Sequence, residues 1–440
     1  MSTHSSIPFQ TGAALPPDSP VYIERACDRE VVGKLEGMYY LTIIEPRQQG
    51  KTSFVYRLMQ RNDFWFLYAD LTTLNLDSEA GWRASLCQRL GLQHIRTRAE
   101  HTLFPPVGET WYDFLESLAR HVEGERRRLV IVLDEIGASP SLAEPFFRAL
   151  RAIYNERSIK PVFKRLTFIL AGAYDPRDFI ANSNFSPFNV AERLYLKDFM
   201  IDEVVRLVCK LDVPVDQRLP LAERIHFWTD GHPYLSQALC RYLAELSPSL
   251  AEQSRSLVPD DVDKGVKSLI QKDRNNLAHI GKELERDTTL REPFRRLLRG
   301  DQGIFFNPDG VPWHGRLELL GILKVDASGY CKVRNRIYQE AFASLPLVNS
   351  SQCLTGPQCE QLVKAILDGF DQPALQELLL FNWNEQLTNI AGNVPFRQVA
   401  LEVVQWAANE GLIPELLNAL AKARPMNAAV QKTVSDLRVV

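Results

Sequence analysis

Four short apolar runs that alternate with helical patterns constrain the fold of this chain more than any other feature. The runs are YYLTII (39–44), FWFLYADL (64–71), LVIVLDE (129–135) and LTFILAGAY (166–174). Their length and their β-branched and aromatic residues are typical of buried strands. The intervening segments include helical patterns at 79–91, 110–124 and 144–157. Strands that alternate with helices predict a parallel sheet with helices on both faces.

The strand pattern ends near residue 198, and mainly helical segments follow. Residues 291–345 combine helices with GILKVDASGYCKVRN, a predicted β pair that turns at Ala327, Ser328 and Gly329. Helices with a small hairpin favour a winged-helix unit. The polar stretch NSSQCLTGPQ (349–358) contains Pro and Gly and is the best domain boundary in the chain.

The stretch IIEPRQQGKTS (43–53) places a phosphate-loop pattern between the first strand and the next helix. Gly50, Lys51 and Thr52 match the end of G-x-x-x-x-G-K-[ST]. In that loop backbone amides surround phosphates, the lysine reaches the β- and γ-phosphates, and the hydroxyl holds Mg²⁺. The triplet is short, and a surface turn with an exposed lysine is the alternative interpretation.

The carboxylates at the end of LVIVLDE favour a nucleotide site. Asp134 would act on Mg²⁺, directly or through water, and Glu135 would orient and deprotonate the attacking water. One strand (64–71) falls between the two motifs, so the strand that ends in Asp134 is not expected beside the loop strand. Aspartate also caps helices well, which is the alternative interpretation of this pair. Together the motifs predict ATP and Mg²⁺ as cofactors.

Glu45 stands where the pattern normally has its first glycine. Proline at 46 fixes the next φ and pushes Glu45 toward an extended conformation. A carboxylate aimed at phosphates would repel them, so Glu45 is expected to face away. Binding is compatible with this sequence, but fast turnover does not follow from it.

Composition excludes several classes of protein. The net charge of −3 argues against a protein whose main work is wrapping nucleic acid. The seven cysteines contain no C-x-x-C pair, and the histidines lack metal-site spacing, so reduced thiols and no transition metal are expected. The N-terminus does not read as a secretory signal, and no apolar run is long enough to span a bilayer. These features predict a cytoplasmic protein without a membrane partner.

The chain resembles the AAA-like ATPase domain of bacterial STAND-type signalling NTPases. The matching stretches are GAALPPDSPVYIERACDRE (12–30), PRQQGKTS (46–53), LVIVLDEI (129–136), LAGAYDPRDFI (170–180), SPFNVAERLYLKDF (186–199), TDGHPYLSQALCRYL (229–243) and GRLELLGILKVDASGYCKVRNRIYQEAF (315–342). This family commonly replaces the first loop glycine and has Pro-Arg-Gln before GK[ST]. The resemblance implies that Tyr22–Arg25 receives the base and that Gly231, His232 and Pro233 belong to a helical lid, with Pro233 near the adenine.

The resemblance and the motifs together give a set of candidate site residues. The nucleotide-binding candidates are Pro46, Arg47, Gln48, Gln49, Gly50, Lys51, Thr52, Ser53, Tyr22, Ile23 and Pro233. Lys51 and Glu135 are the catalytic candidates, and Thr52 and Asp134 are the Mg²⁺ ligands. Arg193 and Arg177 are possible phosphate sensors, although each could be a surface arginine. Gly231-His232-Pro233 could also be a plain helix start, because proline suits the first turn.

The C-terminal segment resembles the small death-like effector-associated domains that accompany such ATPases. The resemblance covers LTGPQCEQLVKAILDGF (354–370), PALQELLLFNWNEQLTNIA (373–391), FRQVALEVVQWAANEGLIPELLNAL (396–420) and ARPMNAAV (423–430). Val399, Val403 and Trp406 repeat on one helical face, as do Leu416, Leu417 and Leu420, which predicts a helical bundle. Phe381 and Trp383 are expected in its core. In the family such domains pair with a similar domain on an effector.

These observations predict an α/β P-loop ATPase with a C-terminal all-α bundle. The predicted parts are a flexible N-terminus (1–20), the ATPase core (21–198), a helical lid (199–288), a winged-helix unit (289–348), a linker (349–355) and the death-like bundle (356–440). STAND proteins typically carry a repeat array as sensor, and this chain shows no such repeat. The trigger would then be read by another subunit or by the ATPase core itself.

The expected function is an ATP-dependent signalling switch in a bacterial immunity or conflict system. Nucleotide state would control self-association into a homo-oligomer, which would recruit an effector that carries a similar death-like domain. One alternative is a DNA-acting ATPase, because Lys332, Arg334 and Arg336 would alternate on one strand face, although a solvated hairpin is favoured there. Another is a scaffold that binds ATP and barely hydrolyses it.

Overall fold

The computed structural model describes most of the chain in two compact units. The described residues are 8–74, 77–97, 108–138, 140–174, 190–252, 255–273, 275–300, 303–343, 356–383, 385–391, 394–409 and 412–438. One unit comprises Met1–Asp287 with Leu297–Ala343, and the other comprises Thr288–Arg296 with Ser344–Val440.

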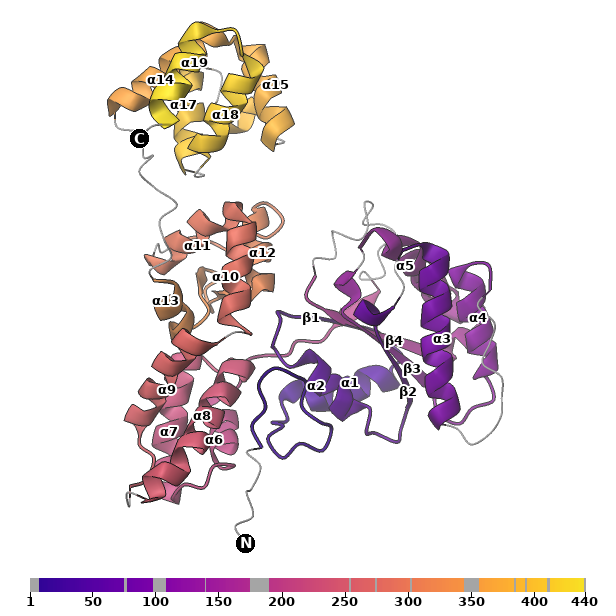
Figure 1. The fold of residues 1–440 in the computed structure, drawn as a ribbon. Coiled ribbons are helices and arrows are strands. Elements are labelled where there is room, and N and C mark those ends of the chain that lie inside the picture. Colours follow the sequence, from indigo (N-terminus) through magenta and orange to yellow (C-terminus); the bar gives the residue numbers. More distant parts are fainter. Residues whose placement is uncertain are drawn as a thin grey trace. The chain divides into compact units, whose positions relative to one another are not determined.

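A parallel five-stranded sheet forms the centre of the α/β part of the first unit (Figure 1). Its strands are β1 (Tyr40–Ile44), β2 (Trp65–Asp70), β3 (Leu129–Asp134), β4 (Leu166–Gly172) and β5 (Ala191–Arg193). Their order is β2-β3-β4-β1-β5, and every pairing is parallel. The parallel sheet is confirmed, and so is the prediction that the Asp134 strand is not adjacent to the loop strand, because β4 lies between them.

The short strand β5 was not predicted from the sequence. It has only three residues, which are partly or fully exposed, so it lacks the apolar signature of the buried strands. It is fixed by pairing with β1, in which Tyr40 lies opposite Ala191. Tertiary pairing thus creates a strand that local composition does not indicate.

Helices cover both faces of the sheet, as predicted (Figure 1). One face carries α1 (Ala26–Glu36) and α2 (Lys51–Leu58), and the other carries α3 (Glu79–Thr97), α4 (Trp111–His121) and α5 (Pro140–Asn155). Successive strand residues serve opposite faces: Val130 packs with the first pair of helices, and Ile131 packs with the other three. This alternation explains why the strands are apolar throughout, since both faces are buried.

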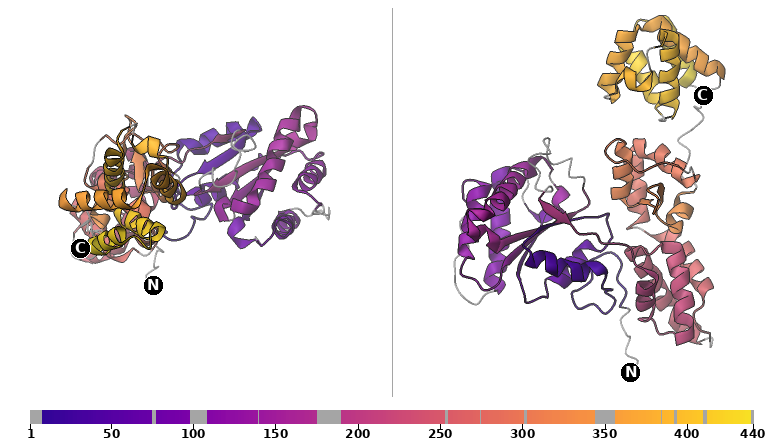
Figure 2. Two further views of the ribbon diagram at one scale, coloured as in Figure 1. Left: turned by 90° about the horizontal axis from the view of Figure 1, so that it is seen from above. Right: turned by 180° about the vertical axis from the view of Figure 1, so that it is seen from behind.

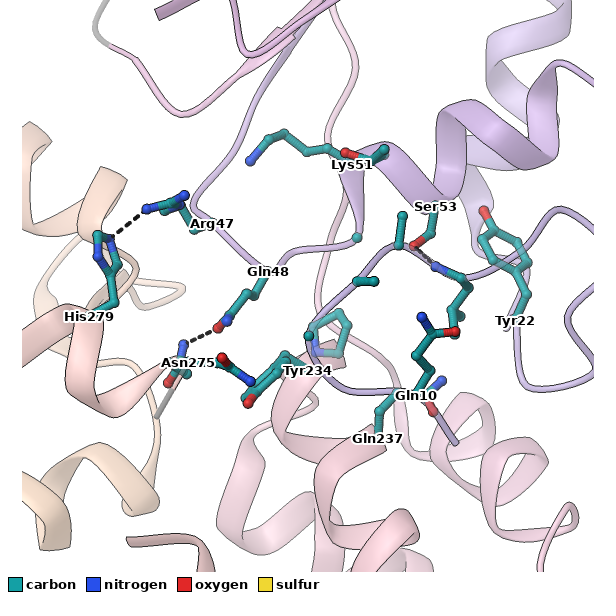
Figure 3. A pocket seen from close by; sticks show the side chains of 18 of the residues that line it. Gln10, Tyr22, Arg47, Gln48, Lys51, Ser53, Tyr234, Gln237, Asn275 and His279 are labelled. Carbon is teal, nitrogen blue, oxygen red and sulfur yellow. Dashed lines mark hydrogen bonds between the residues drawn. The ribbon is translucent and has the colours of Figure 1, made fainter. Parts of the chain in front are cut away.

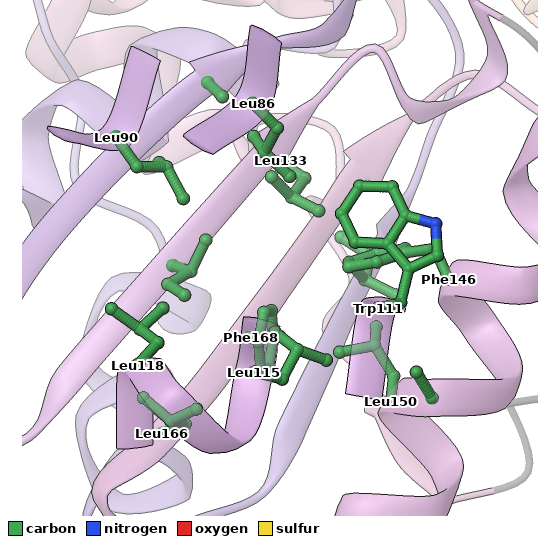
Figure 4. Packing of buried hydrophobic residues seen from close by; sticks show 14 of the residues in the cluster. Leu86, Leu90, Trp111, Leu115, Leu118, Leu133, Phe146, Leu150, Leu166 and Phe168 are labelled. Carbon is green, nitrogen blue, oxygen red and sulfur yellow. The ribbon is translucent and has the colours of Figure 1, made fainter. Parts of the chain in front are cut away.

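Three aromatic side chains of the larger core cluster pack against one another, and Figure 4 shows two of them, Trp111 and Phe146. The ring centroids of Trp82 and Trp111 are 4.8 Å apart, and those of Trp111 and Phe146 are 4.9 Å apart, both edge to face. Such pairs favour edge-to-face geometry because the ring edge is positive and the ring face negative. The cluster joins α3, α4 and α5 into one layer over the sheet.

Helices and one hairpin follow the sheet along the chain, and in both figures α6 to α9 lie side by side (Figures 1 and 2). The elements are α6 (Ile201–Val208), α7 (Val215–Thr229), α8 (Pro233–Glu252), α9 (Pro259–Lys272), α10 (Leu277–Arg286), α11 (Arg291–Leu298), α12 (Pro312–Leu320), β6 (Leu323–Val325), β7 (Cys331–Val333) and α13 (Arg336–Phe342). Strands β6 and β7 are antiparallel, and the turn between them includes Gly329 at a φ of 86°. The predicted β pair and its turn are confirmed.

The prediction that Lys332, Arg334 and Arg336 alternate on one strand face is wrong. Strand β7 ends at Val333, so the three basic residues do not share one strand. Lys332 is exposed, but Arg334 is buried, and Arg336 lies in α13, where it donates to the carbonyl of Phe227. The continuous basic face that motivated the DNA alternative is therefore absent at these residues.

The C-terminal unit contains a helical bundle with a core of its own (Figure 1). Its helices are α14 (Gly356–Gly369), α15 (Gln372–Trp383), α16 (Leu387–Ile390), α17 (Phe396–Asn409), α18 (Ile413–Ala423) and α19 (Ala428–Arg438). The predicted apolar faces are confirmed: the core includes Val399, Val403, Leu416, Leu417 and Leu420.

One predicted core residue of the bundle is on its surface. Trp383 packs against Trp406, with ring centroids 5.8 Å apart. Phe381, however, is 77 % exposed, so the expectation that it fills the core is wrong. Leu379, two residues earlier on the same helix, occupies the core instead and is fully buried.

Across the described part of the chain, no helix is both long and apolar enough to span a bilayer.

Candidate nucleotide-binding site

A cavity of about 490 Å³ opens beside the phosphate loop (Figure 3). In parallel sheets ligands bind at the carboxyl ends of the strands, and the loop after β1 lies at that edge. The volume is within the roughly 300–1,000 Å³ of typical ligand pockets. Ten of the predicted residues line it: Tyr22, Ile23, Arg47, Gln48, Gly50, Lys51, Thr52, Ser53, Glu135 and Pro233.

The other predicted residues are placed differently. Asp134 lies directly behind Thr52, and Pro46, Gln49 and Arg193 do not line the cavity. Arg193 donates instead to the carbonyl of Ile44 at 2.8 Å, at the end of β1. Arg177 falls outside the described residues.

The phosphate loop turns at positions other than the replaced glycine. Gln48 and Gly50 have left-handed backbones, with φ of 62° and 88°, whereas Glu45 does not. Gly50 is the N-cap of α2 and gives that helix no side-chain cap. The first-turn amides of an uncapped helix are available to an anion, and the helix dipole favours negative charge there. Glu45 faces away from the loop, as expected: a carboxylate oxygen accepts from the Leu196 amide at 3.1 Å.

Lys51 is held inside the loop by backbone carbonyls. Its ammonium group donates to the carbonyl oxygens of Glu45 and Pro46, each at 2.8 Å. Only 5 % of the residue is exposed, and burial lowers the pKa of Lys51, while nearby carboxylates oppose that shift. The lysine is thus positioned at the entrance of α2, where the phosphate-loop pattern requires it.

Thr52 and Asp134 form a buried oxygen cluster. The hydroxyl of Thr52 donates to Asp134 Oδ2 at 2.8 Å, and the hydroxyl of Tyr68 donates to the same oxygen at 3.1 Å. The other carboxylate oxygen accepts from the backbone N–H of Glu135 at 3.0 Å. A hydroxyl beside a carboxylate is the hard-oxygen donor set that suits Mg²⁺.

The charged side chains around the cavity fit a polyphosphate. Arg25, Arg47 and Lys51 line it, and Glu135 is the carboxylate among the described lining residues. Excess positive charge in a cleft attracts anionic ligands. Glu135 has a left-handed backbone with a φ of 52°, which is strained for a residue other than glycine. Such strain is common where a side chain is held for function.

The apolar end of the cavity lies between the core and helix α8. Tyr22 and Ile23 line it together with Pro233 and Gln237 of α8. The phenol of Tyr22 donates to Asp28 at 2.6 Å, which fixes the ring, and Gln237 donates to the carbonyl of Val21 at 2.9 Å. Pro233 begins α8, so the helix-start interpretation holds, and the same residue also lines the cavity.

Part of the N-terminal segment, predicted to be flexible over residues 1–20, packs against the rest of the unit. Phe9 is buried, and Gln10 and the residues from Gly12 to Leu15 line the cavity. The backbone N–H of Leu15 donates to the hydroxyl of Ser53 at 2.9 Å. The Ser- and Pro-rich composition does not indicate this contact, because Ser53 belongs to helix α2 and lies 38 positions away.

Helix α10 and the turn before it supply further residues that the sequence did not indicate. The side-chain amide of Asn276 donates to Gln48 at 2.6 Å, and a guanidinium nitrogen of Arg47 lies 3.4 Å from His279 Nε2 (Figure 3). Neither residue belongs to a recognisable motif. For Gln237, a signal did exist: it follows Pro233 by four positions and so shares its helical face.

Comparisons with known proteins agree with this fold. The AAA-like domain family matches residues 114–344, which is more than half of the chain, and Effector-associated domain 1 matches residues 352–438. The fold and the family match are those of an AAA-like P-loop ATPase. This chain belongs to the AAA-like domain family and carries an effector-associated domain after it.

One curated relative is an uncharacterized WD repeat-containing protein of Synechocystis sp. It is 29 % identical over 255 residues, which cover 54 % of this chain and 21 % of that protein. The chain therefore spans about a fifth of the length of the curated relative it matches.

Solved structures match most of this chain at low identity. A Walker-type ATPase of Pyrococcus abyssi has 13 % identity and a TM-score of 0.54, with coverage of 76 % of this chain and 99 % of the other. The ORC2 protein of Aeropyrum pernix, solved with ADPNP and ADP, has 14 % identity and a TM-score of 0.44, with coverage of 75 % and 94 %.

Proposed function

We propose that this protein is a STAND-like signalling ATPase that binds ATP and Mg²⁺ in the cavity beside the phosphate loop. One observation carries the proposal. The cavity joins a phosphate end, with Lys51, Thr52 and Glu135, to an apolar end with Tyr22 and Pro233. Its walls come from both the sheet core and helix α8, so a nucleotide that fills it would contact both.

The proposed roles follow from the positions of the side chains. Lys51 would turn from the loop carbonyls to the β- and γ-phosphates, and Thr52 and Asp134 would hold Mg²⁺. The metal ion, when bound, would neutralise charge on the phosphates. Glu135 would orient a water molecule and accept its proton.

Nucleotide state would be transmitted by the lid. Because α8 and α10 line the same cavity as the phosphate loop, a change in the bound nucleotide would change the contacts of these helices. We infer that this change exposes surfaces for self-association into a homo-oligomer. Assembly would then bring several effector-associated domains together, and the high effective concentration would compensate for weak single contacts.

The C-terminal bundle would recruit the effector. It has its own apolar core, and its family is shown by the match to Effector-associated domain 1. We propose a partner with a similar death-like domain, within a bacterial immunity or conflict system. The basic strand face that motivated the DNA-acting alternative is absent, because Arg334 is buried.

The decisive experiment combines light scattering after size-exclusion chromatography with an assay for released phosphate. Wild type, Lys51→Ala and Glu135→Gln are compared with and without ATP·Mg²⁺. We expect ATP to drive assembly of wild type, Lys51→Ala to abolish it, and Glu135→Gln to prolong it while phosphate release falls. Assembly of wild type without measurable phosphate release would favour the ATP-binding scaffold. Identical behaviour of all three proteins without nucleotide binding would refute the proposal.

The recruitment step needs its own test. Residues 350–440 would be used as bait against a candidate effector that carries a similar domain, with the chain truncated at 348 as the control bait. Retention by the bundle alone is expected. Retention by the truncated chain alone would contradict the adaptor role.

A further inference from the structure

One residue of the phosphate loop points away from the cavity into a buried polar cluster. Gln49 is 1 % exposed, although it lies between two residues that line the cavity. Its side-chain N–H groups donate to the carbonyl of Leu196 at 2.8 Å and to Asp198 at 3.0 Å. Its side-chain oxygen accepts from Arg334 at 2.6 Å.

Arg334, which makes this contact, lies near the C-terminal end of the first unit's sequence. It follows strand β7, is 7 % exposed, and lies 285 positions after Gln49. The same guanidinium nitrogen donates to Asp198 at 2.6 Å, and Lys324 of β6 pairs with that carboxylate at 3.1 Å. Although burial alone would raise it, these positive charges lower the pKa of Asp198 overall. Strand β6 and the residue after β7 thus contact both the phosphate loop, at Gln49, and the segment after β5, at Asp198.

The hydrogen bonds to Gln49 hold the phosphate loop where its backbone conformation is unusual. Gln48 and Gly50, on either side, have left-handed backbones that a free chain rarely adopts together. Arg25 also donates to the carbonyl of Gln49 at 3.1 Å, so both the main chain and the side chain of this residue are held. Charged hydrogen bonds in a buried site are stronger than neutral ones and fix one geometry.

We propose that Arg334 is a positioning residue that holds the phosphate loop in its binding shape through Gln49. Nucleotide affinity then depends on docking of the β6–β7 hairpin, and nucleotide binding in turn stabilises the docked hairpin. This reciprocity is required of any coupling between two equilibria. The inference rests on the proposed function, because it concerns the same nucleotide site.

Coupling between hairpin docking and nucleotide binding should affect the affinities for ATP and ADP alike. The loop amides surround phosphates that ATP and ADP share, so loss of Arg334 should weaken both ligands to the same degree. Arg334→Met removes the charge. Arg334→Lys keeps a charge for Asp198, but its ammonium group lies one bond closer to the backbone than the guanidinium nitrogen that donates to both Gln49 and Asp198. Arg336→Met is the matched control, because this nearby arginine contacts Phe227 and not the loop.

The test measures binding of ATP·Mg²⁺ and ADP by calorimetry and hydrogen exchange of residues 323–334. We expect Arg334→Lys and Arg334→Met to bind both nucleotides about tenfold or more weakly, as loss of a charged hydrogen bond implies. At saturating nucleotide, hydrogen exchange in the hairpin should become slower in wild type and in Arg336→Met. It should remain unchanged in Arg334→Lys. Arg334→Lys keeps the test valid if Arg334→Met does not fold.

Three outcomes separate failure of this inference from failure of the proposed function. Wild type that binds neither nucleotide would remove the proposed function and the inference together. Wild type that binds nucleotide, with unchanged affinity and unchanged hairpin protection in Arg334→Lys, would overturn the inference alone. A loss in Arg334→Lys that Arg336→Met shares equally would also overturn it, since the effect would then be a general weakening of the hairpin.

Discussion

The hydroxyl of Thr52 donates a hydrogen bond to the carboxylate of Asp134 over 2.8 Å, although 82 positions separate the two residues. The bond connects the first turn of α2 to the end of β3. It places a hydroxyl and a carboxylate oxygen where a divalent cation beside a phosphate would need them.

The first prediction concerns the magnesium dependence of ATP binding. Thr52→Val keeps the shape of the side chain and removes the hydroxyl. We expect the affinity for ATP in Mg²⁺ to fall about tenfold, with little change in excess chelator, because the proposed Mg²⁺ ligand would be lost. Titration calorimetry in both conditions measures the difference. Tyr68→Phe, which removes the other hydroxyl on Asp134, is the control and should have a smaller effect; equal Mg²⁺ dependence in Thr52→Val and wild type would contradict the assignment.

The second prediction concerns the pH dependence of stability at Glu45. Burial raises the pKa of Glu45 from 4.5 to about 7, although Arg193, the Leu196 amide, Arg334 and Lys51 oppose the shift. Because the folded-state pKa is raised, the folded protein binds more protons than the unfolded chain between these values. The contribution of Glu45 to the free energy of unfolding therefore falls as the pH rises from about 4.5 to about 7 and levels off above that range.

Glu45→Gln should remove this contribution. The variant and wild type should differ little near pH 4.5, and the variant should be more stable above pH 7 by at most about 3 kcal/mol. Denaturant titrations at both pH values measure the difference between the two proteins. A stability difference that stays constant across the range would show that Glu45 does not titrate there.

The third prediction concerns the turn before α8. Gly231 has a φ of 77°, and a Cβ atom there would lie 2.0 Å from the carbonyl oxygen of Phe199. Gly231→Ala should lower the free energy of unfolding by about 2 kcal/mol or more, because both the backbone and the contact are incompatible with a side chain. Gly281→Ala in α10 is the control: no atom lies within 4 Å of its Cβ position, so we expect a neutral or slightly stabilising effect. Thermal unfolding of the two variants should rank them in this order.

The fourth prediction concerns the C-terminal bundle. Leu379 is fully buried and Phe381 is 77 % exposed, two positions apart on α15. Leu379→Ala should destabilise the bundle by about 2–5 kcal/mol through the cavity it leaves, and Phe381→Ala should change its stability by less than about 0.5 kcal/mol. Hydrogen exchange of the bundle helices in the full chain reports both values. Equal losses of protection in the two variants would contradict the observed burial.

Local patterns predicted most of the fold correctly. The long strands and the helices that cover them are marked by runs and periodicities within ten to twenty residues, and the GKT and Asp-Glu motifs lie where those elements end. The misses have a common cause. Strand β5 is defined by pairing with β1, and the exposure of Phe381 depends on how α15 is rotated in the bundle. A pattern within one segment carries little information about either.

Residue types at short spacing were enough to predict the class of fold, the phosphate loop and the family. The other residues that share the site became apparent only from the contacts of the folded chain. Folding brings Gln10, the residues from Gly12 to Leu15, and Asn276 to the cavity, and it buries Arg334 against Gln49. Such contacts join segments up to 285 positions apart, and a buried hydrogen bond depends on the partner's position in space, which no local periodicity specifies.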